Sequence, residues 1–546
     1  MLSRAGLWLA PAGLLIAWSC SSTPHKFAAG AGAPGESAGG EGGAGDSRGE
    51  AGEGGSVSPT NSRDDGGAAG DAAGAELTVQ ATMPNDGASA VERDVAIEVS
   101  FSAALDPKTI TSDAFSVVGP TGIVSGRLSV SGAKVTFTPS AAWSLFADYT
   151  VSLASTIRSA QGVPLSSAES FAFQTRDGVF RKPERLTTMN AVNLQVVGSR
   201  AGHVGVVWTD YLMPASTFAV VFDPQSTKWG TAAAVASDAQ ISFISASVAF
   251  NDLGQAFAVA GSNTLVWNRF DGSAWGTARS VPAGHFSSGP CAIADDGTAM
   301  TFWREYVGEE SRVFAQSLSP DDKWSAVATV RSGANLVGLK RFGSGFLALH
   351  QLEADKTLYS SSYDPKRGWL PEKPVTPSAG TFTQGMATTE TAALLLWWDA
   401  TNVATAALFD GTSWTNENLG PVTGGTHASV GERGHVAAWV NQNNAYAARY
   451  DLKLGWQAPS KLGAITAEYT GPGLEIDASG NALAAWPNGS SVSWRRAAHS
   501  SSGWGEPQQI KDQDPAEAVY SSVNSSSGEV MLVWANPLGV WASRFE

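Results

Sequence analysis

The amino-acid sequence predicts an all-β protein in which a disordered tether precedes a small β-sandwich and a β-propeller of eight blades, with seven as the alternative. Three observations support this prediction. From residue 77 onward, apolar and polar residues alternate over short segments, which is the pattern of half-buried strands. Gly contributes 60 and Trp 20 of the 546 residues, while only 16% are charged, a composition unlike that of coiled coils or helical repeats. Tryptophan also recurs at a nearly constant interval through the C-terminal two-thirds of the chain.

The first 19 residues have the pattern of an export signal. Arg4 is followed by an apolar run from Leu7 to Trp18, which leads into Ser19-Cys20. This arrangement resembles a bacterial lipoprotein signal peptide, spanning residues 1–19. The resemblance implies that Cys20 is lipidated and anchors the protein to the membrane, and Ser21 after it implies the outer membrane or cell surface. An ordinary secretory peptide and a short anchor helix are the alternatives.

Residues 20–76 are predicted to be a disordered linker. The segment consists almost entirely of Gly, Ala, Ser and acidic residues, and lacks the apolar side chains that could offset the entropy of ordering. Its acidic residues far outnumber its basic ones, so the linker repels itself and holds the folded part of the chain away from an anionic surface.

A change of pattern at Leu77 marks the start of the predicted sandwich, residues 77–177. Apolar residues occupy alternate positions in four segments that turn residues separate: 95–101, 134–139, 149–153 and 171–175. Several motifs succeed one another in this region, namely Pro84-Asn85-Asp86-Gly87, Leu105-Asp106-Pro107, Phe137-Thr138-Pro139, Tyr149-Thr150-Val151 and Phe173-Gln174-Thr175. Together they resemble the bacterial Ig-like domain of S-layer (SbsA-type) proteins. The resemblance implies an Ig-like β-sandwich that serves as a spacer or adhesion module.

Residues 178–546 contain the predicted propeller. A Trp follows a turn seven times, and six of these turns contain Asp; the residues are Trp229, Trp275, Trp324, Trp369, Trp414, Trp456 and Trp504. Successive members are 46, 49, 45, 45, 42 and 48 residues apart. An apolar strand that often ends in Trp precedes each turn, so each unit accommodates four short strands, the content of one propeller blade. This periodicity predicts that the rings pack between blades, with sugar stacking as the alternative for individual rings.

The two ends of the array predict how the ring closes. The chain stops at residues 540–546, a strand that lacks its expected neighbour, and a matching segment lies before the first repeat at residues 180–186. Pairing of these segments would complete the last blade and remove two exposed sheet edges.

No residue is assigned a catalytic or metal-binding role, and no cofactor is expected. The seven His residues lack the spacing of a metal site, and His427 and His435 lie eight residues apart. Cys291, the only cysteine besides Cys20, lies in an apolar segment that predicts a buried thiol on a strand.

Candidate ligand-binding residues lie in the loops that join the second and third strands of each blade, because these loops emerge together at one face of a rigid scaffold. They are Tyr211, Arg304, Glu305, Tyr306, Asp355, Asp399, Asn441 and Asn443. Plain solvated loops are the alternative for each of them.

These observations predict a monomeric, non-catalytic surface lipoprotein whose propeller binds an extracellular protein or glycan. The net charge of −15 excludes the broad positive field of a nucleic-acid-binding protein. The alternative is a glycan-binding lectin or a sialidase-like exo-glycosidase. Convergence of arginine and acidic side chains at the centre of the ring would favour that alternative.

Overall fold

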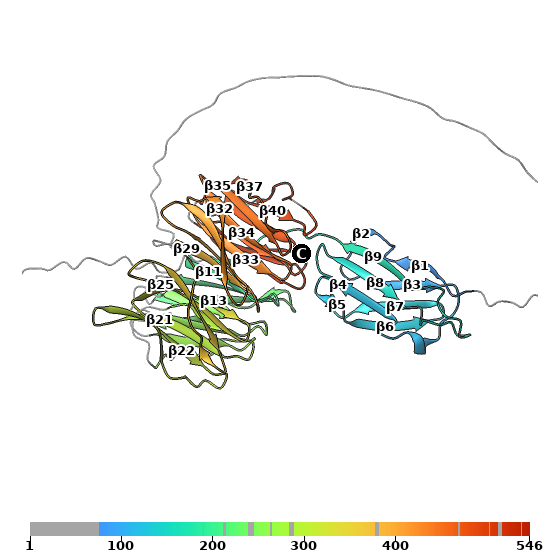
Figure 1. Ribbon diagram of the computed structural model, residues 1–546, viewed down its shortest axis with the longest axis horizontal. Helices are drawn as coiled ribbons and strands as arrows, with labels where there is room; N and C mark the ends of the chain where they lie inside the picture. Colours follow the sequence, from blue (N-terminus) through green and yellow to red (C-terminus); the bar gives the residue numbers. More distant parts are fainter. Residues whose placement is uncertain are drawn as a thin grey trace, which may run out of the picture. The chain divides into compact units, whose positions relative to one another are not determined.

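Alternating residues between Leu77 and Thr175 form the two sheets of a β-sandwich, drawn in blue and cyan in Figure 1. One sheet has the order β1 (Val79–Met83), β3 (Ile97–Phe101), β7 (Lys134–Pro139) and β6 (Gly126–Ser131). The other has the order β2 (Ala88–Val91), β9 (Glu169–Thr175), β8 (Asp148–Leu153), β4 (Phe115–Gly119) and β5 (Gly122–Ile123), and a single 3-10 turn, η1 (Pro107–Thr109), follows β3. The four predicted segments are thus confirmed as the strands β3, β7, β8 and β9.

The sandwich is held together by side chains that alternate inward along these strands. In β8 every second residue is buried, and β3 and β4 bury their apolar residues in the same way. Trp143 lies at the centre, 2% exposed, with its ring 4.7 Å from that of Tyr149 and 5.6 Å from that of Phe173. Burial of these large rings is the main driving force for this unit.

This computed structural model describes residues 76–188, 191–210, 215–238, 245–261, 265–282, 289–376, 382–467, 470–501, 503–511, 516–536 and 538–546. Cys20 and the predicted linker up to residue 75 lie outside the described residues.

Beyond the sandwich, the described residues form eight further sheets, which we call blades 1 to 8 in chain order. Blade 1 contains β11 (Val192–Gly198), β12 (Val204–Asp210), β13 (Ala215–Asp223), β14 (Lys228–Trp229) and β15 (Ala233–Asp238). Blade 2 contains β16 (Ser245–Phe250), β17 (Ala256–Gly261), β18 (Val266–Phe270) and β19 (Arg279–Ser280). Blade 3 contains β20 (Cys291–Ile293), β21 (Ala299–Val307), β22 (Glu310–Leu318) and β23 (Ala328–Ser332). Blade 4 contains β24 (Ala334–Phe342), β25 (Gly345–Leu352), β26 (Leu358–Asp364), β27 (Gly368–Trp369) and β28 (Lys373–Pro374).

The remaining four blades have the same antiparallel order. Blade 5 contains β29 (Phe382–Thr388), β30 (Ala393–Trp398), β31 (Val403–Phe409) and β32 (Trp414–Pro421). Blade 6 contains β33 (Thr426–Gly431), β34 (Gly434–Asn441), β35 (Asn444–Asp451), β36 (Gly455–Trp456) and β37 (Ser460–Ala464). Blade 7 contains β38 (Gly473–Ile476), β39 (Ala482–Asn488), β40 (Ser491–Ala497) and β41 (Gln508–Lys511). Blade 8 contains β42 (Ala518–Val523), β43 (Val530–Asn536), β44 (Gly539–Phe545) and β10 (Glu184–Thr187).

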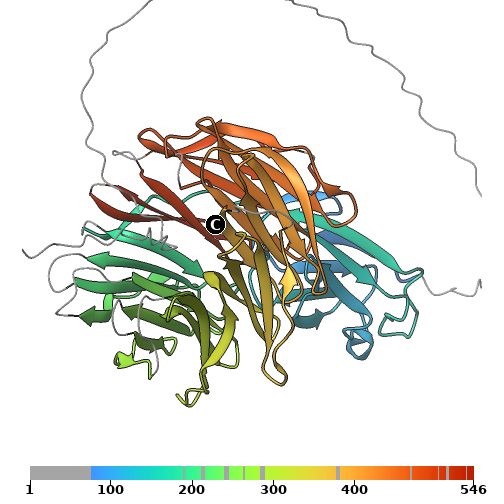
Figure 2. The ribbon, with the colours of Figure 1, turned by 60° about the vertical axis from the view of Figure 1, so that its left-hand side comes forward.

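The eight blades form a closed ring, a β-propeller. The first strand of each blade contacts the first strand of the next, from β11 and β16 round to β38 and β42, and β42 contacts β11. In Figure 2 the colours pass from green through yellow and orange to red, and the red strands lie beside the first green ones. The first strands therefore surround the axis of the ring.

The predicted closure of the ring is confirmed. Strand β10 pairs antiparallel with β44, Glu184 opposite Ala542 and Arg185 opposite Trp541. Ahead of β10, Phe180 pairs with Phe545 and packs its ring 5.1 Å from the rings of both Phe545 and Trp494. The N-terminal segment thus supplies the outermost strand of blade 8, which otherwise comes from the C-terminus.

The repeated tryptophans pack inside and between blades, as predicted. The turn Trp of five blades lies against the aromatic residue that ends the third strand, with ring centroids 5.0–5.5 Å apart. The second-strand tryptophans are buried, as Trp208, Trp303 and Trp486 are each 1% exposed. In the turns, the Asp carboxylate accepts backbone N–H bonds, for example from Thr412 and Ser413 to Asp410. These positions are therefore occupied by packing and turn formation.

We predict that deleting residues 179–186 destabilises the whole ring, because blade 8 loses a strand and Trp494 loses its packing partner Phe180. The expected loss is about 3 kcal/mol or more, on the order of the cost of removing one packed aromatic side chain. Thermal unfolding followed by tryptophan fluorescence would measure it, with deletion of residues 40–47 in the linker as a control of equal length. An unchanged unfolding midpoint would contradict the closure.

Candidate functional site

The antiparallel order of each blade sorts its turns onto two faces of the ring. Turns between the first and second strands, and between the third and fourth, lie at one face, which we call the 1–2 face. Hairpins between the second and third strands lie at the opposite face, which we call the 2–3 face. The sequence-predicted ligand-binding residues that fall within the described ranges belong to the second group.

At the 2–3 face, the hairpin of blade 3 brings two of the predicted residues together. The guanidinium of Arg304 lies 5.2 Å from the ring centroid of Tyr306 and donates a hydrogen bond to Oδ1 of Asn335 at the start of β24. Tyr306 itself is 62% exposed. Glu305 instead accepts a hydrogen bond from Nε1 of Trp303, 3.0 Å away. Arg304 is thus directed toward the axis, and Tyr306 presents an open aromatic surface beside it.

The other predicted residues are spread over separate blades and serve mainly their own turns. Asp355 and Asp399 each accept a hydrogen bond through Oδ1 from the backbone N–H two residues further on, at 2.9 and 2.8 Å. Asn441 and Asn443 belong to the β34–β35 hairpin, where Asn443 has φ 58°. Tyr211 lies outside the described residues. The structure does not gather these residues into one site.

At the 1–2 face, five charged side chains from five blades meet in what we call the axial ion network. Arg200 binds Asp252 and Glu390 through Nη2, both at 3.0 Å. Arg341 binds Asp252 at 3.1 Å and Asp295 at 2.6 Å through Nη1, and Glu390 at 3.2 Å through Nη2. Blades 1 and 5, which supply Arg200 and Glu390, are opposite one another in a ring of eight. The network therefore crosses the axis at this face.

The sandwich contacts the same face, on the turns of blades 7 and 8. The buried Leu145 donates its backbone N–H to the carbonyl of Ser527 at 2.8 Å. Arg496 of blade 7 binds Asp177 at 2.9 Å and the buried Asp477 at 3.2 Å. These contacts are partly apolar and partly ionic, so the junction resembles a packed interior more than a flexible hinge.

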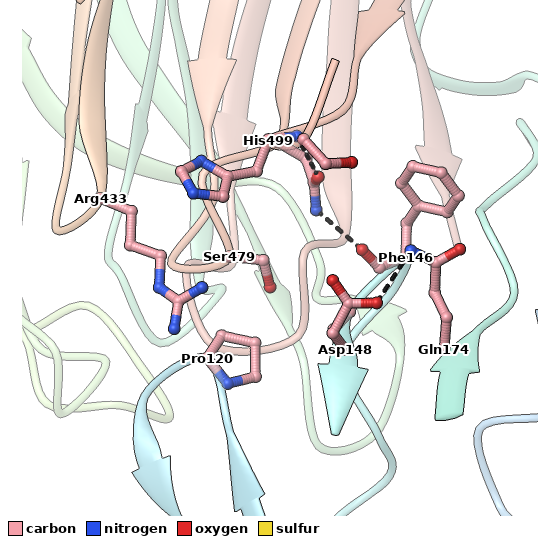
Figure 3. A pocket seen from close by; sticks show the side chains of 10 residues that line it. Pro120, Phe146, Asp148, Gln174, Arg433, Ser479 and His499 are labelled. Carbon is pink, nitrogen blue, oxygen red and sulfur yellow. Dashed lines mark hydrogen bonds between the residues drawn. The ribbon is translucent and has the colours of Figure 1, made fainter. Parts of the chain in front are cut away.

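A small cavity of about 20 Å³ lies within this junction (Figure 3). Arg433, Ser479 and His499 line it from the ring, and Asp148 and Gln174 from the sandwich. Gln174 donates a hydrogen bond to Asp148 at 3.0 Å. A cavity of this size holds about one water molecule. We therefore assign it to the junction rather than to ligand binding.

The interior of the ring contains an isolated lysine. Lys340 lies on β24, the first strand of blade 4, and is exposed between buried neighbours such as Leu339. Among the described residues, no hydrogen bond or ion pair reaches its ammonium group. Its charge acts on Cys291, His427 and Glu475, which belong to blades 3, 6 and 7. Because these residues surround the axis, the Lys340 ammonium lies inside the ring, where water still reaches it.

Glu475 and His427 have altered proton affinities in this interior. Burial raises the pKa of Glu475 to about 7, although Ser521, Ser429 and Lys340 favour its ionised form. Ser429 donates a hydrogen bond to its Oε2 at 3.3 Å. Burial, with the charge of Lys340, lowers the pKa of His427 to about 4. At neutral pH the interior thus contains a neutral imidazole and a carboxyl group whose raised pKa lies close to that pH.

Neither a reactive thiol nor a metal site emerges from the described residues. Cys291 is confirmed as a buried thiol on a strand, with Sγ 3.3 Å from the carbonyl oxygens of Ser247 and Phe257. Burial raises its pKa to about 12, so it is not a nucleophile at neutral pH. His435 pairs with Val430, three positions along β33 from His427, and no group of three or more His, Cys, Asp or Glu is placed to hold a metal within the described ranges.

Sequence reasoning missed the residues that meet on the axis, because they come from different repeats. A signal was present for part of the network. Arg200, Asp252 and Asp295 each stand two residues before the glycine of their turn, at Gly202, Gly254 and Gly297. Superposing the repeats would have placed these three charges side by side. Lys340 and Glu475 have no such common position.

Comparison with known proteins agrees with the Ig-like sandwich. A family model described as a bacterial Ig-like domain matches residues 73–175. A solved structure titled "Structure of Dos1 propeller" is 10% identical with a TM-score of 0.48, covering 68% of this chain and 95% of that one. A prolyl endopeptidase structure is 10% identical with a TM-score of 0.39, covering 66% of this chain and 55% of that one. None of the curated proteins compared with the chain matches it. Across the described ranges, helices long and apolar enough to cross a bilayer were not found.

We predict that Glu475→Gln changes how stability depends on pH. A pKa of about 7 in the folded protein, above the ordinary 4.5, means that the folded state binds more protons between these values, so wild-type stability falls as pH rises from about 4.5 to 7. The variant should lack this fall, a difference of about 1–3 kcal/mol, since one pKa unit corresponds to about 1.4 kcal/mol. Urea unfolding at several pH values would measure it, with exposed Glu506→Gln of the same blade as control. Parallel curves for wild type and Glu475→Gln would contradict the assignment.

Proposed function

We propose that this protein is an extracellular binding scaffold that uses the 2–3 face of its propeller to recognise a partner. One observation supports this choice of face above the others. The sandwich packs on the 1–2 turns of blades 7 and 8, and the axial ion network crosses the same face between blades 1 to 5. The opposite face carries exposed Tyr306 with Arg304 beside it.

We place the protein at the bacterial cell surface, attached through a lipid on Cys20. The bacterial Ig-like match supports a surface or extracellular location, and the N-terminal pattern supports the lipid anchor. The acidic linker and the sandwich would then act as spacers, and an unidentified extracellular protein or glycan would be the partner of the monomeric propeller.

A lectin or sialidase-like exo-glycosidase is the second candidate, and one observation favours it. Arginine and acidic side chains do converge at the centre of the ring, as that function requires. In the axial ion network, however, both arginines are engaged by carboxylates, so a substrate would have to displace existing ion pairs. Catalysis also needs an acid or base within hydrogen-bonding distance of a bound substrate. We therefore favour binding without turnover.

The lipid anchor has a direct test. In the native bacterial host, mass spectrometry of the mature protein should find diacylglyceryl on Cys20 at the N-terminus, because the residues before it match a lipoprotein signal. Cys20→Ala should move the protein from the membrane fraction to a soluble or unprocessed form, while Cys291→Ala should leave fractionation unchanged. An unmodified Cys20 in the mature chain would rule out the anchor.

The binding face can be tested with purified residues 77–546 on a glycan array and in a pull-down from outer-surface proteins. We expect Tyr306→Ala and Arg304→Gln to weaken binding about tenfold or more, since aromatic and arginine side chains dominate recognition surfaces. Leu454→Ala, an exposed residue of the 1–2 face, is the matched control. The same protein should not turn over sialoside, glycoside or ester substrates. Turnover that Glu390→Gln or Glu305→Gln abolishes would establish the enzyme instead.

A further inference from the structure

We propose that the interior of the ring binds a small carboxylate ligand, which enters from the 2–3 face and pairs with the ammonium group of Lys340. This inference rests on the proposed use of the 2–3 face for binding and names the chemistry of a ligand that reaches beyond it into the ring. Four observations on the described residues lead to it: the isolated charge of Lys340, the donors around it, the network at the far end of the axis, and the arginine at the entrance.

The isolated charge of Lys340 is the first of these observations. The eight first strands contain two cationic side chains, Lys340 and Arg341. Arg341 is held by three carboxylates of the axial ion network, whereas no carboxylate within the described residues lies in ion-pair distance of Lys340. A cation enclosed on several sides, accessible to water and without a counter-ion is favourable for an incoming anion.

The residues around Lys340 favour a ligand group that carries one negative charge over a group that carries two. His427 is neutral at neutral pH and retains one N–H donor, whereas the Ser429 hydroxyl already donates to Glu475. Glu475 is the only acidic residue on the first strands, and in its protonated form it donates a hydrogen bond. One ammonium with the neutral donors of His427 and protonated Glu475 matches a carboxylate better than a phosphate dianion, which usually requires several charged or backbone donors.

The two ends of the axis differ in a way that sets the direction of entry. At the 1–2 face, the axial ion network combines two guanidinium groups with three carboxylates, so it carries excess negative charge that repels an incoming anion. At the 2–3 face, Arg304 is bound to Asn335 at the start of β24, the same strand that carries Lys340. Five residues of strand span about 16 Å, so one strand connects a cation at the entrance to a cation inside.

The test measures binding of succinate and glucuronate to purified residues 77–546 by calorimetry, with phosphate and neutral glucose as comparison probes. The wild type should bind a carboxylate probe with one site. Lys340→Met should weaken binding about tenfold or more, because it removes the charge partner, whereas Lys340→Arg should largely preserve it. Glu475→Gln should bind at least as well as wild type, since it removes a competing negative charge. Lys461→Met, an exposed lysine on β37, is the control and should behave as wild type.

Each outcome decides a separate claim. Carboxylate binding that Lys340→Met leaves unchanged would overturn the site, as would absence of binding of either carboxylate to the wild type. Tighter binding of phosphate, lost in Lys340→Met, would overturn the assignment to carboxylates. Tyr306→Ala tests recognition of a macromolecular partner, and it does so in a different assay. Failure of the Lys340 prediction therefore leaves the proposed binding face intact. Failure of the Tyr306 prediction, in turn, does not by itself exclude an anion site at Lys340.

Discussion

Burial of each blade against its neighbours is the constraint on which the whole structure depends. The apolar clusters of the ring are shared between consecutive blades, as where Val436 and Ala438 of blade 6 pack with Leu474 and Trp486 of blade 7. A blade without a neighbour would expose one of these surfaces to water. The chain meets this requirement by returning residues 180–187 to the edge of its own C-terminal strand, where Phe180 joins the cluster of blades 7 and 8.

The same constraint explains why the repeated residues say little about function. In five blades the turn Trp lies on the aromatic residue that ends the third strand, and turn Asp residues such as Asp410 accept backbone N–H groups. Positions that recur in every repeat are therefore needed for packing and turns. Residues that are not repeated in the other blades, such as Lys340 on β24 and Glu475 on β38, have no part in this shared packing. Such residues can give a ring of this kind its binding specificity.

Charge is distributed unequally along the axis of the ring. At the 1–2 face three carboxylates bind two guanidinium groups, which leaves excess negative charge. Inside the ring, burial favours the neutral forms of Glu475 and His427 around a lysine that stays in contact with water. Electrostatic interactions are stronger in such an enclosed space than on the surface. A ligand charge would consequently have a larger effect inside the ring than on either face. We therefore regard the 2–3 face and the interior of the ring as one candidate binding site, with the 1–2 face as its far end.

The sequence by itself determined the all-β fold, the alternation of the sandwich strands and the repeat period, because each of these depends on patterns local to one strand or one repeat. It also predicted the pairing of residues 180–186 with 540–545, because the strand missing at one end of the array is present at the other. It also proposed Arg304 and Tyr306, which lie on one strand, as ligand-binding candidates. It treated Asp355 and Asp399 as ligand-binding candidates, although their carboxylates cap their own turns. Only the tertiary structure decided that Arg200 meets Glu390 and that the charge of Lys340 acts on residues of blades 3, 6 and 7. Contacts across the axis join residues separated by as many as 190 positions, and ring closure alone brings them within reach.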